Sequence, residues 1–434
     1  MVGQKVRSST EQGRGMLHIL SEDCPLMIIA LLLGCLSLTA TAATYSGGNG
    51  TQEAPYLIST AEDFKTIGDT PADWDKRFKL TQNIDLSGYD ETDLQMIGRW
   101  VALGSLSNQP FKGEFDGNGM TISGFTYKDL HAEYVGLFQH VTGDIKYLKL
   151  IRPTVDGDKL GTGALVGFLD RAGGLLGCAA TDVWVSGNNG VGGLAGVVDG
   201  SAHNCYTDGA VWGVKYVGGL VGQVGLGTLA YCYSKAAVSG SESVGGLAGV
   251  MTREEGIVNS SYALGEVKGD AYVAGLVGQV VAGRIYQCYA AGAVSGKQFA
   301  GGLVGYQRAL AQVLASFWDT QSSNQAKSVG GTGKTTAEMK SMDTFLPMNW
   351  NFFTTWTICE GMNYPVLVWQ IPPGDLVCPD GVTLRDFAWF AARWRQRTCG
   401  DANLFCDGAD LDHSGYVEFR DLAIFANNWL YGVE

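Results

Sequence analysis

A glycine-rich motif close to Val-Gly-Gly-Leu-Val-Gly recurs seven times in this chain at an almost constant interval. Its central leucines are Leu137, Leu165, Leu194, Leu220, Leu247, Leu276 and Leu303. The steps between them are 28, 29, 26, 27, 29 and 27 residues. Self-similarity at a fixed period of about 20–50 residues is typical of stacked repeat architectures, in which each repeat contacts only its neighbours. The motif therefore predicts a stacked coil and excludes a single closed globule.

A second column of small residues repeats with the same period. Its members are Cys178, Cys205, Cys232, Ser261, Cys288 and Ser316. Aromatic residues follow five of them, namely Tyr206, Tyr233, Tyr262, Tyr289 and Phe317. The shared period predicts an all-β fold, a parallel β-solenoid (β-helix) of about seven turns of roughly 27 residues, in which equivalent side chains stack about 4.8 Å apart. The handedness of the coil is left open. The role of the tyrosines is also open, because they can form either a binding stripe or a stacked face.

Two local patterns set the expected form of each turn. Alternate residues such as Leu220, Gly222 and Val224 are expected to face the interior, because successive side chains of a strand point to opposite faces. A coil must also bend sharply at fixed places, and glycine adopts positive φ without steric cost. The recurring glycines are therefore interpreted as corner residues.

The first 43 residues have the order of a secretory signal peptide. Basic residues precede an apolar run at 27–33, and small residues follow at 40–42. A lipoprotein whose acylated N-terminus is Cys35 is the alternative. The apolar run is shorter than the roughly 20 residues that span a bilayer, so no transmembrane anchor is expected. The chain is therefore predicted to be secreted, extracellular or on the cell surface.

The chain is acidic, with a formal net charge of −13 at pH 7. An acidic surface repels the phosphates of nucleic acids and of anionic membranes, so neither is an expected partner. Such a surface suits divalent cations and neutral glycans, and a glycan is kept as a candidate ligand.

Changes in composition and periodicity divide the chain into segments. These are a signal peptide (1–43), an N-terminal cap of the solenoid (44–130), the repeat coil (131–307), a C-terminal cap (308–370), a linker (371–376) and a C-terminal module (377–434). Caps are expected because terminal turns would otherwise expose an open sheet edge. Ser59 with Glu62, and Thr335 with Glu338, predict a helix start in each cap. The segment 116–119 is expected to be a tight turn between two strands.

The periodicity changes from coil to helix in the C-terminal module. Its apolar residues form two equivalent sets, Phe387, Phe390, Ala391 and Trp394, then Leu422, Phe425, Ala426 and Trp429, offset by 35 residues. Each set has helical spacing, which predicts two equivalent helices that pack their apolar faces together.

A twelve-residue acidic loop precedes the second of these helices. Its positions 1, 3, 5, 7, 9 and 12 are Asp410, Asp412, Ser414, Tyr416, Glu418 and Asp421. Side-chain oxygens, the Tyr416 carbonyl and a turn at Gly415 match the pattern of a helix-associated calcium loop, so Ca²⁺ is the predicted cofactor. The equivalent loop before the first helix has Val377 and Pro379 at ligand positions. That loop is expected to have lost its ion.

The cysteines outside the first 43 residues fall into two groups. Those of the repeat column, Cys178, Cys205, Cys232 and Cys288, are expected to be buried and reduced, because serine replaces cysteine at two turns. The remaining four, Cys359, Cys378, Cys399 and Cys406, lie outside the coil and are the candidates for disulfide bonds. Their pairing is left open.

The repeat motif together with Cys232-Tyr233-Ser234 resembles GLUG-motif repeats, which occur in large secreted and surface proteins, including some bacterial peptidases and adhesins. The tail resembles a dockerin-type repeat pair, the calcium-dependent docking module of secreted polysaccharide-degrading assemblies. The combination is similar to exported proteins of planctomycete-like bacteria. The resemblance implies calcium binding by the loop and docking to a cohesin-like or envelope protein. The partner-reading Ser-Thr pair of some dockerins is replaced here by Phe419-Arg420.

Three functions remain in competition. No catalytic constellation is evident in the sequence, which favours a non-catalytic, adhesin-like scaffold docked through its tail. A polysaccharide lyase or glycoside hydrolase is the alternative, but the column at Asp208 continues as Lys235 and Leu264, so no acidic pair stacks. Peptidase activity by analogy with GLUG-containing peptidases is the third. The chain has five histidines and neither an HExxH nor a GxSxG motif.

Overall fold

A computed structural model describes residues 45–352, 354–400 and 403–432. The signal peptide expected at 1–43, with its Cys35 alternative, lies outside the described residues. The chain separates into two units, 1–43 and 44–434, and the fold belongs to the second. Within the described ranges, the helices are too short or too polar to cross a bilayer.

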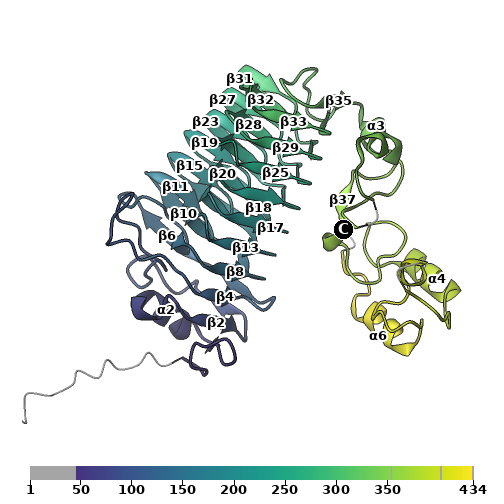
Figure 1. The fold of residues 1–434 in the computed structure, drawn as a ribbon, viewed down its shortest axis with the longest axis horizontal. Helices are drawn as coiled ribbons and strands as arrows, with labels where there is room; N and C mark the ends of the chain where they lie inside the picture. The colour runs from purple at the N-terminus through teal and green to yellow at the C-terminus, as the bar shows by residue number, and fades with distance from the viewer. Residues whose placement is uncertain (1–44, 353, 401–402, 433–434) are drawn as a thin grey trace, which may run out of the picture. The chain divides into compact units, whose positions relative to one another are not determined.

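The predicted parallel β-solenoid is confirmed, with three sheets along the coil and about seven turns (Figure 1). One sheet contains β1 (Tyr56–Ile58), β2 (Arg77–Leu80), β4 (Glu114–Asp116), β8 (Asp144–Lys146), β13 (Gly174–Leu176), β17 (Ser201–His203), β21 (Thr228–Ala230), β25 (Ile257–Asn259), β29 (Arg284–Tyr286) and β33 (Gln312–Leu314). A seven-stranded sheet contains β7 (Phe138–Val141), β12 (Val166–Leu169), β16 (Ala195–Val198), β20 (Val221–Val224), β24 (Ala248–Met251), β28 (Val277–Val280) and β32 (Val304–Gln307).

The third sheet contains the longest strands of the coil together with shorter ones. Its members are β3 (Ile84–Asp85), β5 (Thr121–Ser123), β6 (Thr126–Asp129), β9 (Lys149–Ile151), β10 (Thr154–Gly157), β11 (Leu160–Gly163), β14 (Ala179–Ser186), β15 (Asn189–Gly192), β18 (Tyr206–Trp212), β19 (Lys215–Gly218), β22 (Tyr233–Ser234), β23 (Ala237–Gly245), β26 (Tyr262–Ala263), β27 (Val267–Ala274), β30 (Tyr289–Ala290), β31 (Val294–Gly301), β34 (Phe317–Asp319) and β35 (Thr332–Lys334). Each strand pairs in parallel with its equivalent in the next turn, so one repeat closes one turn.

The motif leucines form a continuous column inside the coil. Leu194, Leu220, Leu247, Leu276 and Leu303 are each 0% exposed. The amide of each of the first four donates to the carbonyl of the next, at 2.9–3.1 Å. Each of these leucines therefore lies beside the equivalent leucine of the next turn, so successive turns are in register.

The motif glycines are required by close packing, and their interpretation as positive-φ corner residues is wrong. A Cβ at Gly222 would lie 2.2 Å from the carbonyl carbon of Gly190 and 2.4 Å from the amide nitrogen of Val191. Gly222 itself has an ordinary φ. Positive φ recurs instead in two other columns, in each of which most members are not glycine. One is Tyr134, Gly161, Gly190, Tyr216, Ser243, Tyr272 and Phe299, and the other is Tyr147, Gly177, Asn204, Tyr231, Ser260, Gln287 and Ala315.

The two caps begin helices close to the predicted positions. Helix α2 (Ala61–Asp69) starts at Thr60, whose hydroxyl accepts from the Asp63 amide, one residue later than expected from Ser59 and Glu62. Helix α3 (Thr336–Met339) starts at Thr335 as predicted. Segment 116–119 joins β4 and β5, which belong to different sheets, so it is a corner of the coil rather than a hairpin turn. Short 3₁₀ turns are η1 (Pro71–Asp73), η2 (Met342–Thr344), η3 (Leu346–Met348) and η4 (Val368–Gln370).

The tyrosine column is a stacked face that the C-terminal cap covers. Tyr206, Tyr233, Tyr262 and Tyr289 stack with ring centroids 4.9–5.0 Å apart. The cap includes β36 (Trp356–Thr357) and β37 (Val366–Leu367) and contributes Trp350, Trp356 and Trp369 to this cluster. The Trp369 indole donates to the Tyr231 carbonyl at 3.0 Å, and the Tyr289 hydroxyl donates to the Pro365 carbonyl at 2.6 Å. Of the two roles left open for these tyrosines, a binding stripe or a stacked face, the structure shows the stacked face.

The C-terminal module packs two helices together, as their spacing predicted. These are α4 (Leu384–Ala392) and α6 (Phe419–Asn427), with α5 (Leu404–Asp407) between them. The rings of Phe390 and Phe425 lie 5.4 Å apart in the core of the module. The four candidate cysteines form disulfides Cys359–Cys378 and Cys399–Cys406. The four coil cysteines are buried and reduced, as expected.

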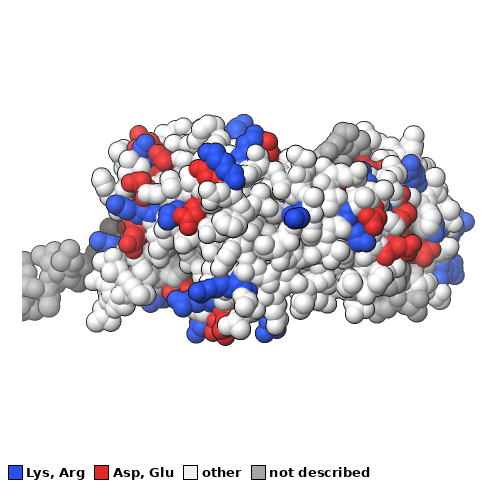
Figure 2. Space-filling model, turned by 90° about the horizontal axis from the view of Figure 1, so that it is seen from above, with Lys and Arg blue, Asp and Glu red and all other residues white. Residues whose placement is uncertain are grey.

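Charged side chains on the coil pair across successive turns. Lys215 meets Glu242 at 2.9 Å, and Lys128 meets Asp156 at 2.9 Å. Figure 2 shows one face of the molecule, on which basic and acidic side chains lie beside one another and a broad area carries neither. The net negative charge is therefore not gathered into one acidic field on that face.

Candidate functional site

The acidic loop at 410–421 brings three of its predicted ligand residues together. Asp410 is 1% exposed, Asp421 is 0% exposed and Asp412 is half-buried. One carboxylate oxygen from each lies within 4.8 Å of the others. Such closely spaced carboxylates suit a hard divalent cation, which neutralises their mutual repulsion.

The loop backbone holds these carboxylates in place. The amides of Ser414 and Gly415 donate to Asp410 at 3.0 and 2.9 Å. The amides of Asp412 and Glu418 donate to Asp421 at 3.0 and 2.8 Å. Gly415 has a φ of 94°, which supports its predicted place at the sharp turn. Hydrogen bonds from Ser414 also hold the pKa of Asp412 below its ordinary value, so this carboxylate is ionised at neutral pH.

The other predicted ligands lie at the exposed side of the loop. The Ser414 hydroxyl donates to the Tyr416 carbonyl at 3.3 Å, which places two further oxygen atoms next to each other. Glu418 is exposed and is not part of the group of three convergent carboxylates. The loop therefore offers three fixed carboxylates, one carbonyl and one hydroxyl, with Glu418 at its rim.

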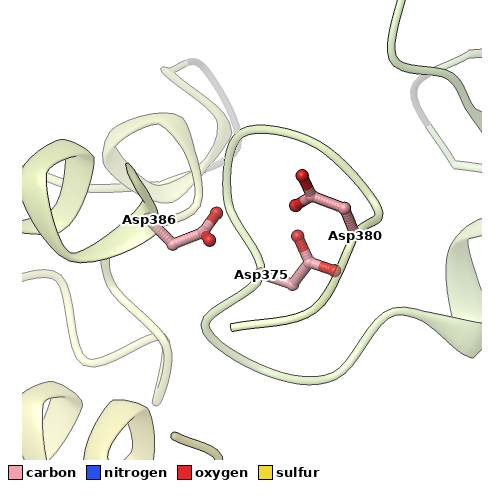
Figure 3. Close-up of side chains that lie close together, drawn as sticks. All are labelled: Asp375, Asp380 and Asp386. Carbon is pink, nitrogen blue, oxygen red and sulfur yellow. The ribbon is translucent and has the colours of Figure 1, made fainter. Parts of the chain in front are cut away.

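A second carboxylate cluster lies in the loop before α4. Asp375, Asp380 and Asp386 each offer an oxygen within 4.8 Å of the others, and Figure 3 shows them pointing toward one another from the loop and from α4. The loop was expected to have lost its ion because Val377 and Pro379 stand at ligand positions, yet it brings three other side-chain carboxylates together. The signal that could have found it is Asp380, which stands where the second loop has Gly415.

This first loop is also stabilised by its own hydrogen bonds. Asp386 is 0% exposed and accepts from the amides of Leu376, Val377 and Thr383 at 2.7–2.9 Å. Burial raises the pKa of Asp375 to about 7. The hydrogen bond from the Gly381 amide opposes this rise, and the neighbouring Asp386 and Asp380 carboxylates add to it. Asp386 therefore orders the loop in the way that Asp421 orders the second one.

A disulfide links this first loop to the coil side of the molecule. Cys378 belongs to the loop, whereas Cys359 belongs to the C-terminal cap that covers the tyrosine column. The second disulfide, Cys399–Cys406, lies within the module, just before the 410–421 loop. The sequence identified the four cysteines but could not pair them, because spacing alone does not fix connectivity.

Comparison with known proteins finds relatives that match part of this chain. A stretch of 193 residues, 44% of the chain, is 31% identical to halomucin of Haloquadratum walsbyi. A stretch of 132 residues, 30% of the chain, is 35% identical to a protein of Evansella cellulosilytica that is provisionally named a Gly-rich membrane protein. The chain spans only 2% and 15% of the lengths of these two relatives. No family model matches the chain.

Comparison with solved structures finds a structure whose chain aligns over most of its length. It is the crystal structure of a protein provisionally described as an immunoglobulin A1 protease from Bacteroides ovatus. The match has a TM-score of 0.43 and 21% sequence identity, and it covers 75% of this chain and 95% of that chain.

Proposed function

We propose that this protein is a secreted or cell-surface, non-catalytic scaffold whose calcium-loaded tail docks it to a cohesin-like or envelope protein. The observation that carries the proposal is the convergence of Asp410, Asp412 and Asp421 in a loop held by its own amides. The coil supplies a rigid, regular body, because each turn is paired along its length with the next.

Calcium is the cation that this loop suits best. Ca²⁺ takes six to eight oxygen ligands in flexible geometry. Asp410, Asp412 and Asp421 would supply carboxylates, and Ser414 and the Tyr416 carbonyl would supply neutral oxygens. Binding would order the start of α6 and so fix the residues that follow the loop.

Exposed apolar residues follow both loops at equivalent positions and form the proposed docking surface. Leu384 is 74% exposed and Phe419 is 76% exposed, and each is followed by an arginine. The two pairs are 35 residues apart, which is the offset between the helices themselves. Large exposed apolar side chains on a small, stable module are typical of protein-binding surfaces.

The proposed location rests on the relatives rather than on the fold. One of them is named halomucin and the other is named a membrane protein, and the name of the first supports a location outside the cell or on its surface. The two disulfides outside the coil support an oxidising compartment.

Calcium binding is tested by titration calorimetry on the purified protein. We expect binding with a Kd between about 10⁻⁵ and 10⁻³ M, and at least a tenfold loss in Asp410→Asn and Asp421→Asn. The matched control is Asp270→Asn, which removes an exposed carboxylate of the coil that pairs with Lys297. Equal affinity in all of these variants would remove the basis of the proposal.

Docking is tested with envelope fractions in calcium and in EDTA. Binding is expected in calcium, with loss in EDTA and in Phe419→Asp, because a buried charge cannot replace an apolar contact. Leu310→Asp is the control, since Leu310 is 78% exposed and lies outside the C-terminal module. A protein that binds neither cells, envelope fractions nor glycans in either condition would contradict the scaffold function.

A further inference from the structure

An aromatic cluster lies on the outer face of the seven-stranded sheet, where solvent-exposed polar residues are the usual occupants. Strand register places His140, Phe168, Val197 and Gln223 in one outward column. The Phe168 ring stacks on His140 at 5.2 Å and on Tyr134 at 4.9 Å. These rings form a small hydrophobic cluster separate from the interior of the coil.

Trp100 closes one end of this column. Its ring lies nearly perpendicular to Tyr134, His140 and Phe168, at 5.1, 5.1 and 5.4 Å. Its amide donates to the Gln139 side chain at 3.0 Å, and its indole donates to Glu133 at 3.1 Å. Trp100 is therefore fixed by two hydrogen bonds as well as by ring contacts, so the aromatic end is preformed.

A groove of about 630 Å³ begins at this aromatic end and runs along the column. Phe168, Val197 and Gln223 line it in that order, so its floor changes from aromatic to aliphatic to amide. Leu103, from the same loop as Trp100, also lines the groove and is 91% exposed. The volume is in the range of small-molecule sites, which hold ligands in clefts of about 300–1,000 Å³.

The far end of the groove carries hydrogen-bonding groups. The Thr252 hydroxyl is buried and has no hydrogen-bond partner among the described residues. One oxygen of Asp199 accepts from the Leu226 amide at 3.1 Å, which orients the carboxylate. Arg253 adds an exposed cation beside them. Because that hydroxyl is buried, the polar groups that a ligand in the groove can reach at this end are the Gln223 amide, the Asp199 carboxylate and Arg253.

We propose that this groove binds the end of a neutral oligosaccharide. A pyranose ring has an apolar C–H face, which suits the Trp100 end, and a hydroxyl edge, which suits Gln223 and Asp199. The distance from Phe168 to Gln223 is two strand spacings, about 10 Å, which is the length of about two sugar rings. Because Trp100 closes one end, the groove accepts a chain terminus rather than the middle of a long chain.

The charged residues that line the groove disfavour binding of an acidic glycan. Two carboxylates, Glu133 and Asp199, line the groove with a single arginine, Arg253, so two negative charges and one positive charge leave the lining with a formal charge of −1. A uronate chain would bring further negative charge to these carboxylates in a protein that already carries a net charge of −13.

The test is direct binding of soluble sugars to the purified protein. The probes are gluco-, manno-, galacto- and xylo-oligosaccharides of two to six units, with oligogalacturonates as the acidic comparison. We expect saturable binding of at least one neutral series, followed by quenching of tryptophan fluorescence and by calorimetry. Gln223→Ala and Trp100→Ala should each weaken binding at least tenfold. Gln223→Ala decides the outcome if Trp100→Ala fails to fold.

The matched control is Trp184→Ala. Trp184 is 56% exposed, its ring lies 4.1 Å from the ring of Trp212, and neither tryptophan lines the groove. Unchanged affinity of Trp184→Ala for the sugar would support binding in the groove. Binding that is lost in Trp184→Ala but kept in Gln223→Ala would overturn the proposal, as would absence of neutral-sugar binding or binding of oligogalacturonates alone.

This site does not depend on the calcium-dependent tail. The same titration in EDTA should give the same affinity, because none of the residues that line the groove belongs to the C-terminal module. Loss of docking in EDTA with intact sugar binding would leave both proposals standing. Loss of sugar binding alone would remove only the groove.

Discussion

The last glycine of the repeat motif lies against the backbone of the preceding turn, as Gly222 does against Gly190 and Val191. The same close approach recurs at Gly196, Gly222, Gly249 and Gly278, where a Cβ would meet backbone atoms at 2.2–2.5 Å. Backbone atoms cannot rotate away as a flexible side chain can. The glycines are therefore a packing requirement of the coil, repeated once per turn.

Gly222→Ala should destabilise the coil by about 1–3 kcal/mol, because the added methyl group overpacks a site that cannot relax. Thermal unfolding followed by circular dichroism measures the loss. Gly88→Ala is the matched control, since no atom lies within 4 Å of a Cβ built there. Equal melting temperatures for the two variants would show that the strands move apart easily, contrary to the argument from close approach.

His140 is a buried imidazole that resists protonation. It is 3% exposed, its Nε2 lies 3.0 Å from Asp170, and its Nδ1 has no hydrogen-bond partner among the described residues. Burial lowers its pKa below the ordinary value of 6.5, and the Asp170 carboxylate only partly opposes this. The folded state therefore binds fewer protons than the unfolded state as pH falls below 6.5.

Stability attributable to His140 is thus fully present above about pH 6.5 and is lost as pH falls through the folded-state pKa. The wild-type protein should lose more thermal stability between about pH 7.5 and about pH 5 than His140→Gln does. Melting temperatures across that range provide the measurement. His131→Gln serves as control because His131 is exposed. A His140→Gln profile parallel to that of the wild type would contradict the assignment.

At the scale of elements, the repeat period was enough to predict the coil. Leu220 and Leu247 meet one turn apart because a constant period places the same side chain at the same point of each turn. The same period predicts the stacked tyrosine column, but it does not predict that the C-terminal cap covers this column. The contact of Trp369 with Tyr231 joins residues 138 positions apart, and no periodic pattern encodes such a pair.

The two candidate sites differ in the same way, because the residues of one are close together in the sequence and those of the other are far apart. Asp410, Asp412 and Asp421 could be predicted because their positions lie within twelve consecutive residues and calcium ligands follow a fixed spacing. The groove could not be predicted, because Trp100 comes from a loop before the first repeat while Gln223 comes from β20. Only folding of that loop over the sheet brings them together.

At the scale of the whole molecule, the tail is covalently fixed to the cap of the coil. Cys359 and Cys378 enclose the linker 371–376 and are 19 residues apart. A disulfide that closes a loop of this length stabilises the folded state mainly by lowering the conformational entropy of the unfolded chain. In the chain-entropy model this contribution is about 3 kcal/mol. The proposed docking surface therefore belongs to a module that a disulfide ties to the coil rather than to a module on a free tether.

Replacement of this disulfide should loosen the tail without unfolding the coil. In Cys359→Ser/Cys378→Ser we expect faster proteolytic cleavage within 371–376, while the leucine column of the coil stays protected, because its register depends on backbone pairing between turns. Limited proteolysis with mass spectrometry of the fragments measures both. Cys399→Ser/Cys406→Ser is the matched control, since that bond lies within the module and does not enclose the linker. Equal cleavage of the linker in both variants and in the wild type would mean that noncovalent contacts alone hold the tail. The Cys359–Cys378 disulfide would then have no part in positioning the proposed docking surface.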